Sequence, residues 1–131
     1  MQGKETQVME RILIIDDEPQ IRSMLRLMLE RDGYEVVEAP DGIEGIRVHR
    51  QNPADLIITD LIMPHKDGIG MIIDLKKEFP DVKIIAMSGG GLNKPEGYLK
   101  GAKKLGAVCT LTKPIDREEM LRAVRNTLKD S

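Results

Sequence analysis

Apolar residues along the chain gather in five short runs, and each run is followed by a segment in which apolar positions recur with helical spacing. The runs are rich in Ile, Val and Leu and cover residues 11–15, 34–38, 55–60, 82–87 and 108–112. Such alternation predicts a parallel β-sheet with crossover helices on both of its faces. We therefore expect an α/β fold, a doubly wound sheet of five parallel strands.

The composition of the runs predicts their order in the sheet. The runs ILII, DLIIT and KIIAM are almost continuously apolar, which is typical of strands buried on both faces at the sheet centre. The runs YEVVEA and VCTLT include polar residues and fit the two edges. This pattern favours the flavodoxin-like strand order 2-1-3-4-5 over the order 1-2-3-4-5.

The first and last helices have recognisable faces and end signals. We expect Gly33 to end the first helix, and Asp116 with Glu119 to begin the last one as a capping box with a carboxylate in place of the usual hydroxyl. The expected buried face of the first helix consists of Ile21, Met24, Leu25, Met28 and Leu29, and that of the last helix of Met120, Leu121, Val124 and Leu128.

Composition restricts the class of protein. The 131 residues, 40% of them apolar, suffice for one domain, which we place at residues 10–129 after a flexible N-terminal leader, residues 1–9. The 20 Lys and Arg residues nearly balance the 22 Asp and Glu residues, and only three aromatic residues occur, so neither charge nor stacking supports nucleic-acid binding. The apolar runs are too short to span a membrane, and a single cysteine, Cys109, agrees with a reducing compartment, so we expect a soluble, cytoplasmic protein.

Polar side chains follow the strands at the edge where such sheets bind ligands. In an open parallel sheet this edge lies at the carboxyl ends of the strands, near the point where the strand order reverses. Several carboxylates, a hydroxyl and an ammonium are therefore expected to meet there. They are Asp16, Asp17 and Glu18 after the first strand, Asp60 after the third, Ser88 after the fourth and Lys113 after the fifth.

Crowded carboxylates repel one another, and a divalent cation relieves this repulsion. An all-oxygen set without Cys or His at ligand spacing favours Mg²⁺ over zinc. A carboxylate beside a cation and a lysine can attack phosphorus to give an acyl phosphate. Asp60 is the candidate nucleophile because it stands alone at the end of a central strand, whereas Asp16 and Asp17 face different ways and are suited to hold metal.

Each of these residues also has a purely structural interpretation. The DDE sequence could cap the helix that Pro19 opens, and Asp60 could begin a turn. Lys113 could be a solvated strand end and Ser88 a turn residue. Their coincidence at one edge of the sheet favours the joint site.

The motifs ILIIDDEP, DLIITDLIMPHKDG, IIAMSGG and LTKP, in this order, resemble the receiver domain of two-component response regulators over about residues 10–129. The resemblance implies that Asp60 is phosphorylated by a histidine kinase or a histidine phosphotransfer protein. It implies that Asp17, Asp60 and the backbone carbonyl of Ile62 bind Mg²⁺ directly and Asp16 through water. Lys113 would pair with phosphoryl oxygens and precede a cis peptide bond to Pro114, and Ser88 would hydrogen-bond a phosphoryl oxygen.

Departures from the family pattern carry further expectations. Thr110 occupies the position of the usual aromatic switch, and Tyr98 could replace that switch or be an ordinary helix tyrosine. Segment 89–101, which begins at Gly89 and contains several glycines, is longer than expected. Gly89 itself, as a small residue next to Ser88, leaves room for a partner's phosphohistidine. Ile62 offers no group to orient a hydrolytic water, so we expect slow self-dephosphorylation. We assign no role to the two histidines, His49 and His65.

Three functions compete. The first is a single-domain response regulator, not an enzyme, that signals to an unknown protein target by changed protein binding, without nucleic acid or membrane. Its expected surface includes Tyr98, Lys103, Lys104 and Arg122. The second is a phosphatase of the haloacid dehalogenase type, which we rank lower because its D-x-D pair is missing. The third is a receiver excised from a longer regulator or hybrid kinase, although the initial Met and polar leader favour a true N-terminus.

Overall fold

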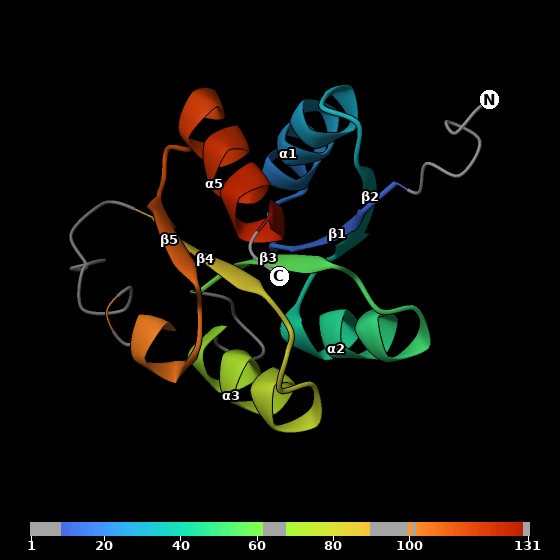
Figure 1. Cartoon of the computed structure of the whole chain (residues 1–131), viewed down its shortest axis with the longest axis vertical. Helices are drawn as coiled ribbons and strands as arrows, with labels where there is room; N and C mark the ends of the chain where they lie inside the picture. Colours follow the sequence, from blue (N-terminus) through green and yellow to red (C-terminus); the bar gives the residue numbers. More distant parts are fainter. Residues whose placement is uncertain (1–8, 62–67, 90–99, 101, 130–131) are drawn as a thin grey trace.

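A five-stranded parallel sheet lies between two layers of helices in the computed structural model, which describes residues 9–61, 68–89, 100 and 102–129 (Figure 1). The strands are β1 (Arg11–Ile15), β2 (Glu35–Ala39), β3 (Leu56–Asp60), β4 (Ile84–Ser88) and β5 (Cys109–Thr112). Their order is β2-β1-β3-β4-β5 and every neighbouring pair is parallel. The predicted fold class and strand order are confirmed.

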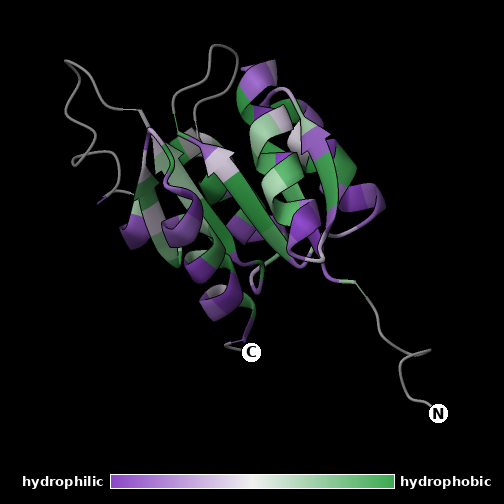
Figure 2. Cartoon of the chain, turned by 90° about the horizontal axis from the view of Figure 1, so that it is seen from above, coloured by the Kyte–Doolittle hydropathy of each residue, from purple (hydrophilic) through white to green (hydrophobic). Residues whose placement is uncertain are grey.

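Burial explains why this order is the stable one. Every residue of β3 and β4 is buried, and β1 is buried from Ile12 to Ile15. Strands β2 and β5 contain both buried and partly exposed residues. The apolar runs therefore occupy the centre, where both faces are covered, and the mixed runs occupy the edges. Figure 2 shows the hydrophobic strands enclosed by helices whose outer faces are hydrophilic.

Helices cover both faces of the sheet. They are α1 (Pro19–Arg31), α2 (Gly42–Gln51), α3 (Gly68–Glu78) and α5 (Arg117–Lys129), and residues 102–105 are also helical. Helices α1 and α5 lie on one face, and α2 and α3 on the other (Figure 1). Each layer encloses its own apolar core, one containing residues of α1 and α5 and the other residues of α2 and α3.

Gly33 is confirmed as an end signal, the Asp116 half of the predicted capping box is confirmed, and one predicted core residue is wrong. Gly33 has a positive φ of 96° just after α1, a conformation that favours glycine. The Asp116 carboxylate accepts a hydrogen bond of 2.9 Å from the backbone N–H of Glu119 at the start of α5. Met24, expected in the core, is 40% exposed. At 100° per residue it lies about 90° from the centre of the arc formed by the buried Leu25, Met28 and Leu29.

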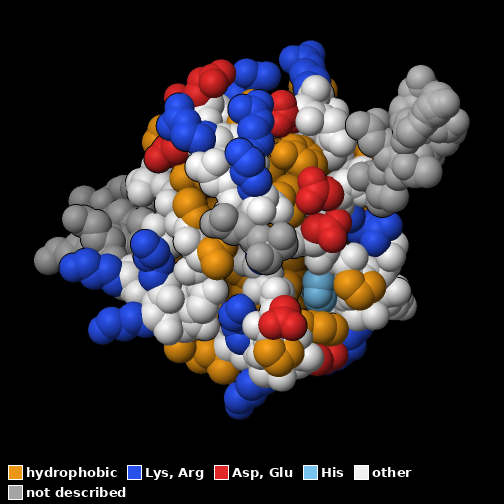
Figure 3. Space-filling view, in the orientation of Figure 1, with side chains coloured by type: hydrophobic (Ala, Val, Ile, Leu, Met, Phe, Trp, Pro, Cys, Tyr) orange, Lys and Arg blue, Asp and Glu red, His pale blue; other side chains and the backbone are white. Residues whose placement is uncertain are grey.

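The surface carries both signs of charge. On the face shown in Figure 3, Lys and Arg side chains are interspersed with Asp and Glu over the helices at the top of the view. Exposed ion pairs on α1 and α5 include Arg125 with Asp32 and Arg26 with Glu30. Among the described residues no helix is both long enough and apolar enough to span a bilayer.

Candidate magnesium and phosphoryl site

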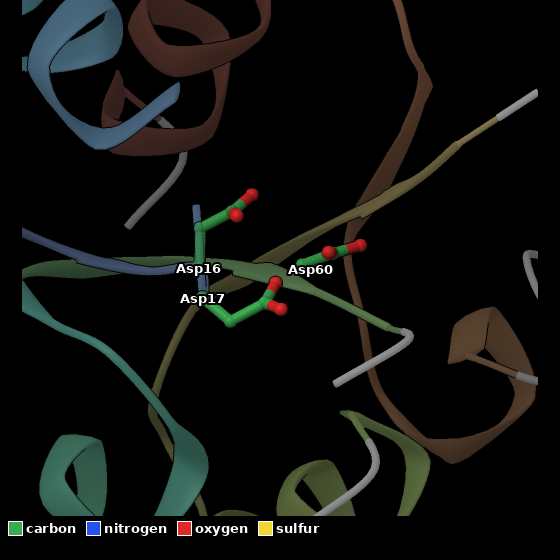
Figure 4. A group of neighbouring side chains, drawn as sticks. All are labelled: Asp16, Asp17 and Asp60. Atoms are coloured by element: carbon green, nitrogen blue, oxygen red, sulfur yellow. The ribbon is translucent and has the colours of Figure 1, made fainter. Parts of the chain in front are cut away.

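Three carboxylates converge at the carboxyl ends of β1 and β3. Asp16 and Asp17 follow the last residue of β1, and Asp60 is the last residue of β3. One oxygen from each lies within 4.8 Å of the other two. Asp16 and Asp17 leave the chain on opposite sides, as expected, with Asp60 beside them (Figure 4). Strands β1 and β3 are neighbours, so residues 44 positions apart in the sequence meet here.

Lys113 joins this cluster from the segment after β5. Its Nζ donates to Asp16 Oδ2 at 2.9 Å and to Asp60 Oδ2 at 3.3 Å, and Glu18 Oε1 lies 3.7 Å away at the exposed rim. Burial lowers the pKa of the Lys113 ammonium, but the hydrogen bond to Asp16 and the charge of Asp60 outweigh it and raise that pKa above its ordinary value. Lys113 is therefore a fixed cation between two carboxylates.

Asp16 is held at every polar atom. Its N–H donates to the carbonyl of Ala39 at 3.2 Å, and its carboxylate accepts from the Glu18 N–H at 2.9 Å as well as from Lys113. Its carbonyl accepts from Arg22 Nη1 at 2.7 Å. Asp16 is fully buried, so these partners offset the cost of taking its charge out of water. Glu18, rather than Asp16 or Asp17, is the N-cap residue of α1, and its side chain makes no capping bond.

Asp60 is 5% exposed, so it is not a solvated turn residue. The hydroxyl of the preceding Thr59 donates to the Asp60 carbonyl at 3.0 Å. The N–H of the following Leu61 donates to the carbonyl of Met87 at 2.9 Å, which continues the pairing of β3 with β4. Both bonds hold the peptide between Asp60 and Leu61, and they thereby restrict the backbone that directs the Asp60 carboxylate.

Ser88 is fully buried at the end of β4, and its hydroxyl has no hydrogen-bond partner among the described residues. Its carbonyl accepts from the backbone N–H of Lys113 at 2.8 Å, and it directly follows Met87, the register partner of Asp60. A buried hydroxyl without a partner is costly, and such groups are uncommon in folded proteins. Because Ser88 lies at the same edge as the carboxylate cluster, its hydroxyl can donate a hydrogen bond to an oxygen-rich group that enters the site.

The donor set suits a magnesium ion. Mg²⁺ takes oxygen ligands at about 2.1 Å, so two of its ligands lie about 3 to 4 Å apart, which is compatible with carboxylate oxygens that all lie within 4.8 Å of one another. Three carboxylates and the one ammonium of Lys113 leave a formal charge of −2, which a divalent cation neutralises. Asp16, Asp17 and Asp60 therefore fit this ion in both chemistry and charge.

The site residues expected from the sequence meet at one edge wherever the structure describes them. Asp16, Asp17 and Asp60 converge, Lys113 contacts Asp16 and Asp60, and Ser88 lies at the same edge. The peptide bond between Lys113 and Pro114 is cis, as the resemblance implies. Ile62, His65 and Tyr98, as well as most of segment 89–101, lie outside the described residues. Thr110 is partly exposed on β5.

Two supporting residues escaped the sequence analysis. Thr59 bonds the Asp60 carbonyl, and Arg22 bonds the Asp16 carbonyl. In the sequence, Thr59 is an ordinary β-branched residue of a strand, and Arg22 is an ordinary polar residue of an amphipathic helix. Only the direction of their side chains reveals these contacts.

Comparisons with known proteins point to one family. A family model described as response regulator receiver domain matches residues 12–125. A receiver domain protein from Clostridium thermocellum is 32% identical with a TM-score of 0.85, covering 92% of this chain and 95% of that one. The chemotaxis protein CheY4 of Vibrio cholerae is 28% identical with a TM-score of 0.82, covering 92% and 99%.

Curated relatives are longer than this chain. The transcriptional regulator RpaA of Synechocystis is 38% identical over 125 residues, which cover 92% of this chain and 50% of RpaA. The chain spans about half or less of the length of the first curated relatives that it matches.

Proposed function

Because this chain belongs to the response regulator receiver domain family of two-component signalling, we propose that Asp60 accepts a phosphoryl group from the phosphohistidine of a histidine kinase or of a histidine phosphotransfer protein. The observation that carries the proposal is the convergence of Asp16, Asp17 and Asp60 around the Lys113 ammonium. Receiver domains are signalling domains, and we propose that this one acts through changed protein binding rather than through turnover of a substrate.

The transfer step uses groups that the site supplies. An oxygen of the Asp60 carboxylate attacks phosphorus, an O–P bond forms, and the N–P bond to the donor histidine breaks, so that the imidazole leaves and takes up a proton. Bound Mg²⁺, held by Asp16, Asp17, Asp60 and the Ile62 carbonyl, would supply positive charge to the phosphoryl oxygens. Lys113 adds a second positive charge beside Asp60.

Phosphorylation of Asp60 would provide a hydrogen-bond acceptor for the Ser88 hydroxyl. This buried hydroxyl, which lacks a hydrogen-bond partner among the described residues, would donate to a phosphoryl oxygen. The acyl phosphate carries a charge of about −1.5 to −2 where the Asp60 carboxylate carried −1, and it brings strong acceptor oxygens, enough to shift Lys113 and Ser88 between two arrangements. The surface proposed to respond includes Lys103, Lys104 and Arg122, which are exposed.

Phosphoimidazole tests this chemistry because it carries the same N–P bond as phosphohistidine. We expect the chain to take up one phosphoryl group from it in the presence of Mg²⁺ and to lose that group on treatment with hydroxylamine, which cleaves acyl phosphates. Asp60→Asn should remain unmodified. A product that resists hydroxylamine would place the phosphoryl group on a hydroxyl such as Ser88 and would contradict the proposal.

A further inference from the structure

Asp17 is the least anchored of the three carboxylates. It is exposed, and no hydrogen bond to its side chain is seen among the described residues, whereas Asp16 is held at four atoms. The position of Asp17 therefore depends on its backbone. Its N–H and the carbonyl of Asp16 belong to the same planar peptide unit, so whatever fixes the Asp16 carbonyl also fixes the start of Asp17.

Arg22 is the residue that fixes this peptide. Its Nη1 donates to the Asp16 carbonyl at 2.7 Å, within the range of a strong charge-assisted hydrogen bond. The same guanidinium donates from Nε to Glu38 Oε1 at 3.1 Å on β2. One side chain of α1 thus ties the loop that carries two carboxylates to the neighbouring edge strand.

The guanidinium is itself held in place. The Arg22 side chain is 17% exposed, and the second oxygen of Glu38 accepts from Arg26 Nη1 at 2.5 Å. Arg26 also donates to the carbonyl of Val36 at 3.0 Å. Burial raises the pKa of Glu38, but the hydrogen bonds from Arg26 and Arg22 together outweigh it and lower that pKa, so Glu38 keeps the charge that orients both arginines.

We propose that Arg22 is a positioning residue for the metal site and that it acts through the peptide between Asp16 and Asp17. This inference rests on the proposed magnesium site. The effect is geometric, because Glu38 and Glu30 together balance the charges of Arg22 and Arg26. Groups that orient metal ligands from behind commonly change metal affinity by about 10-fold or more when they are removed.

Arg26 offers a matched control. Arg22→Met and Arg26→Met each remove one guanidinium from Glu38 and leave the other in place. Only the first removes the bond to the Asp16 carbonyl. Both variants should lower the free energy of unfolding, since both loosen the contact between α1 and β2. A role limited to stability would therefore affect the two in the same way.

The test is titration calorimetry with MgCl₂ at a temperature where all variants are folded, together with the ¹³C chemical shift of the Asp16 carbonyl in the metal-free protein. We expect Arg22→Met to move this shift and to raise the Mg²⁺ Kd about 10-fold. Arg26→Met should leave the Mg²⁺ Kd within twofold of the parent value and the Asp16 carbonyl shift unmoved.

Several outcomes would overturn the inference. An unmoved carbonyl shift in Arg22→Met would show that the bond is not formed in solution. An unchanged Kd despite a moved shift, or an equal rise in both variants, would remove the positioning role and leave the proposed site intact. A parent protein that binds no Mg²⁺ would instead refute the proposed metal site, and the inference with it.

Discussion

Lys113 and Asp16, 97 residues apart in the sequence, are joined by a hydrogen bond of 2.9 Å between Nζ and Oδ2. Neither side chain is well solvated, with exposed fractions of 14% and 0%. Removing one partner of a buried pair leaves the other charge uncompensated, which usually costs several kcal/mol. The Lys113 ammonium therefore stabilises the folded metal-free protein. It also competes with a metal cation for the carboxylates of Asp16 and Asp60.

Lys113→Met should therefore have opposite effects on folding and on metal binding. Without metal we expect the free energy of unfolding to fall by about 3 kcal/mol, because Asp16 loses its counter-charge. We expect the Mg²⁺ Kd to fall at least about 10-fold, since a nearby cation has been removed. Urea unfolding and calorimetry measure the two quantities. Lys83→Met, which removes a half-buried lysine bonded to the Thr127 carbonyl, is the control and should leave the Kd unchanged. Weaker Mg²⁺ binding in Lys113→Met would contradict the charge argument.

Ser88→Ala should cost almost no stability in the unphosphorylated protein. The hydroxyl has no partner to lose among the described residues, so we expect the free energy of unfolding to change by less than about 0.5 kcal/mol. Thr59→Val on the neighbouring strand removes a buried hydroxyl that does have a partner and should lower the free energy of unfolding by about 1 kcal/mol. Urea titration of both variants checks the contrast. Equal losses would mean that Ser88 is bonded in solution.

Gly89 and Gly45 differ in the space that an added Cβ would find. At Gly89 a Cβ would meet no atom of the described residues within 4 Å, whereas at Gly45 it would meet Cδ1 and Cγ1 of Ile15, with Cγ1 at 2.9 Å. Gly45→Ala should lower the free energy of unfolding by about 1 to 3 kcal/mol through overpacking between α2 and β1. Gly89→Ala should leave stability unchanged and slow phosphotransfer from a protein donor more than from acetyl phosphate. Equal slowing with both donors would contradict a role in partner access.

His49 should make stability depend on pH. Burial lowers its pKa below the ordinary value of 6.5, although the charge of Glu78 opposes this shift. Its Nδ1 accepts from the Ala54 N–H at 3.0 Å, which requires a neutral ring at that atom. The unfolded chain then takes up a proton at higher pH than the folded one. The contribution of His49 to the free energy of unfolding is therefore complete above pH 6.5 and is lost as the pH falls toward the folded-state pKa.

Urea midpoints measured between about pH 7.5 and about pH 5.5 test this dependence, since the window brackets the ordinary histidine pKa. We expect the parent to lose stability across the window and His49→Gln to lose less. His65→Gln, which removes the other histidine, should behave like the parent. A parent and a His49→Gln variant with the same slope would rule out His49 as the source.

The backbone arrangement of the site was predictable because strand ends obey topology. Once the apolar runs fixed the strand order, Asp16, Asp17, Asp60 and Lys113 had to meet at the carboxyl edge, and they do. No rotamer needed to be known for that argument. The resemblance then supplied the chemical roles, which remain predictions.

Side-chain directions were not predictable in the same way. The bond of Arg22 to the Asp16 carbonyl depends on how a long side chain bends back along α1. That no described residue bonds the Ser88 hydroxyl depends on the directions of the surrounding side chains. Met24 fitted the apolar period of α1 yet lies outside its buried arc. Periodicity gives the centre of a helix face better than its edges.

Intact mass after incubation with acetyl phosphate tests the central claim most directly. The parent, Asp60→Asn and Asp81→Asn, a control at an exposed turn, would be compared with and without Mg²⁺. The account predicts one added phosphoryl group in the parent and in Asp81→Asn, dependent on Mg²⁺, and none in Asp60→Asn. Phosphorylation that persists in Asp60→Asn, or that proceeds equally well without Mg²⁺, would contradict it.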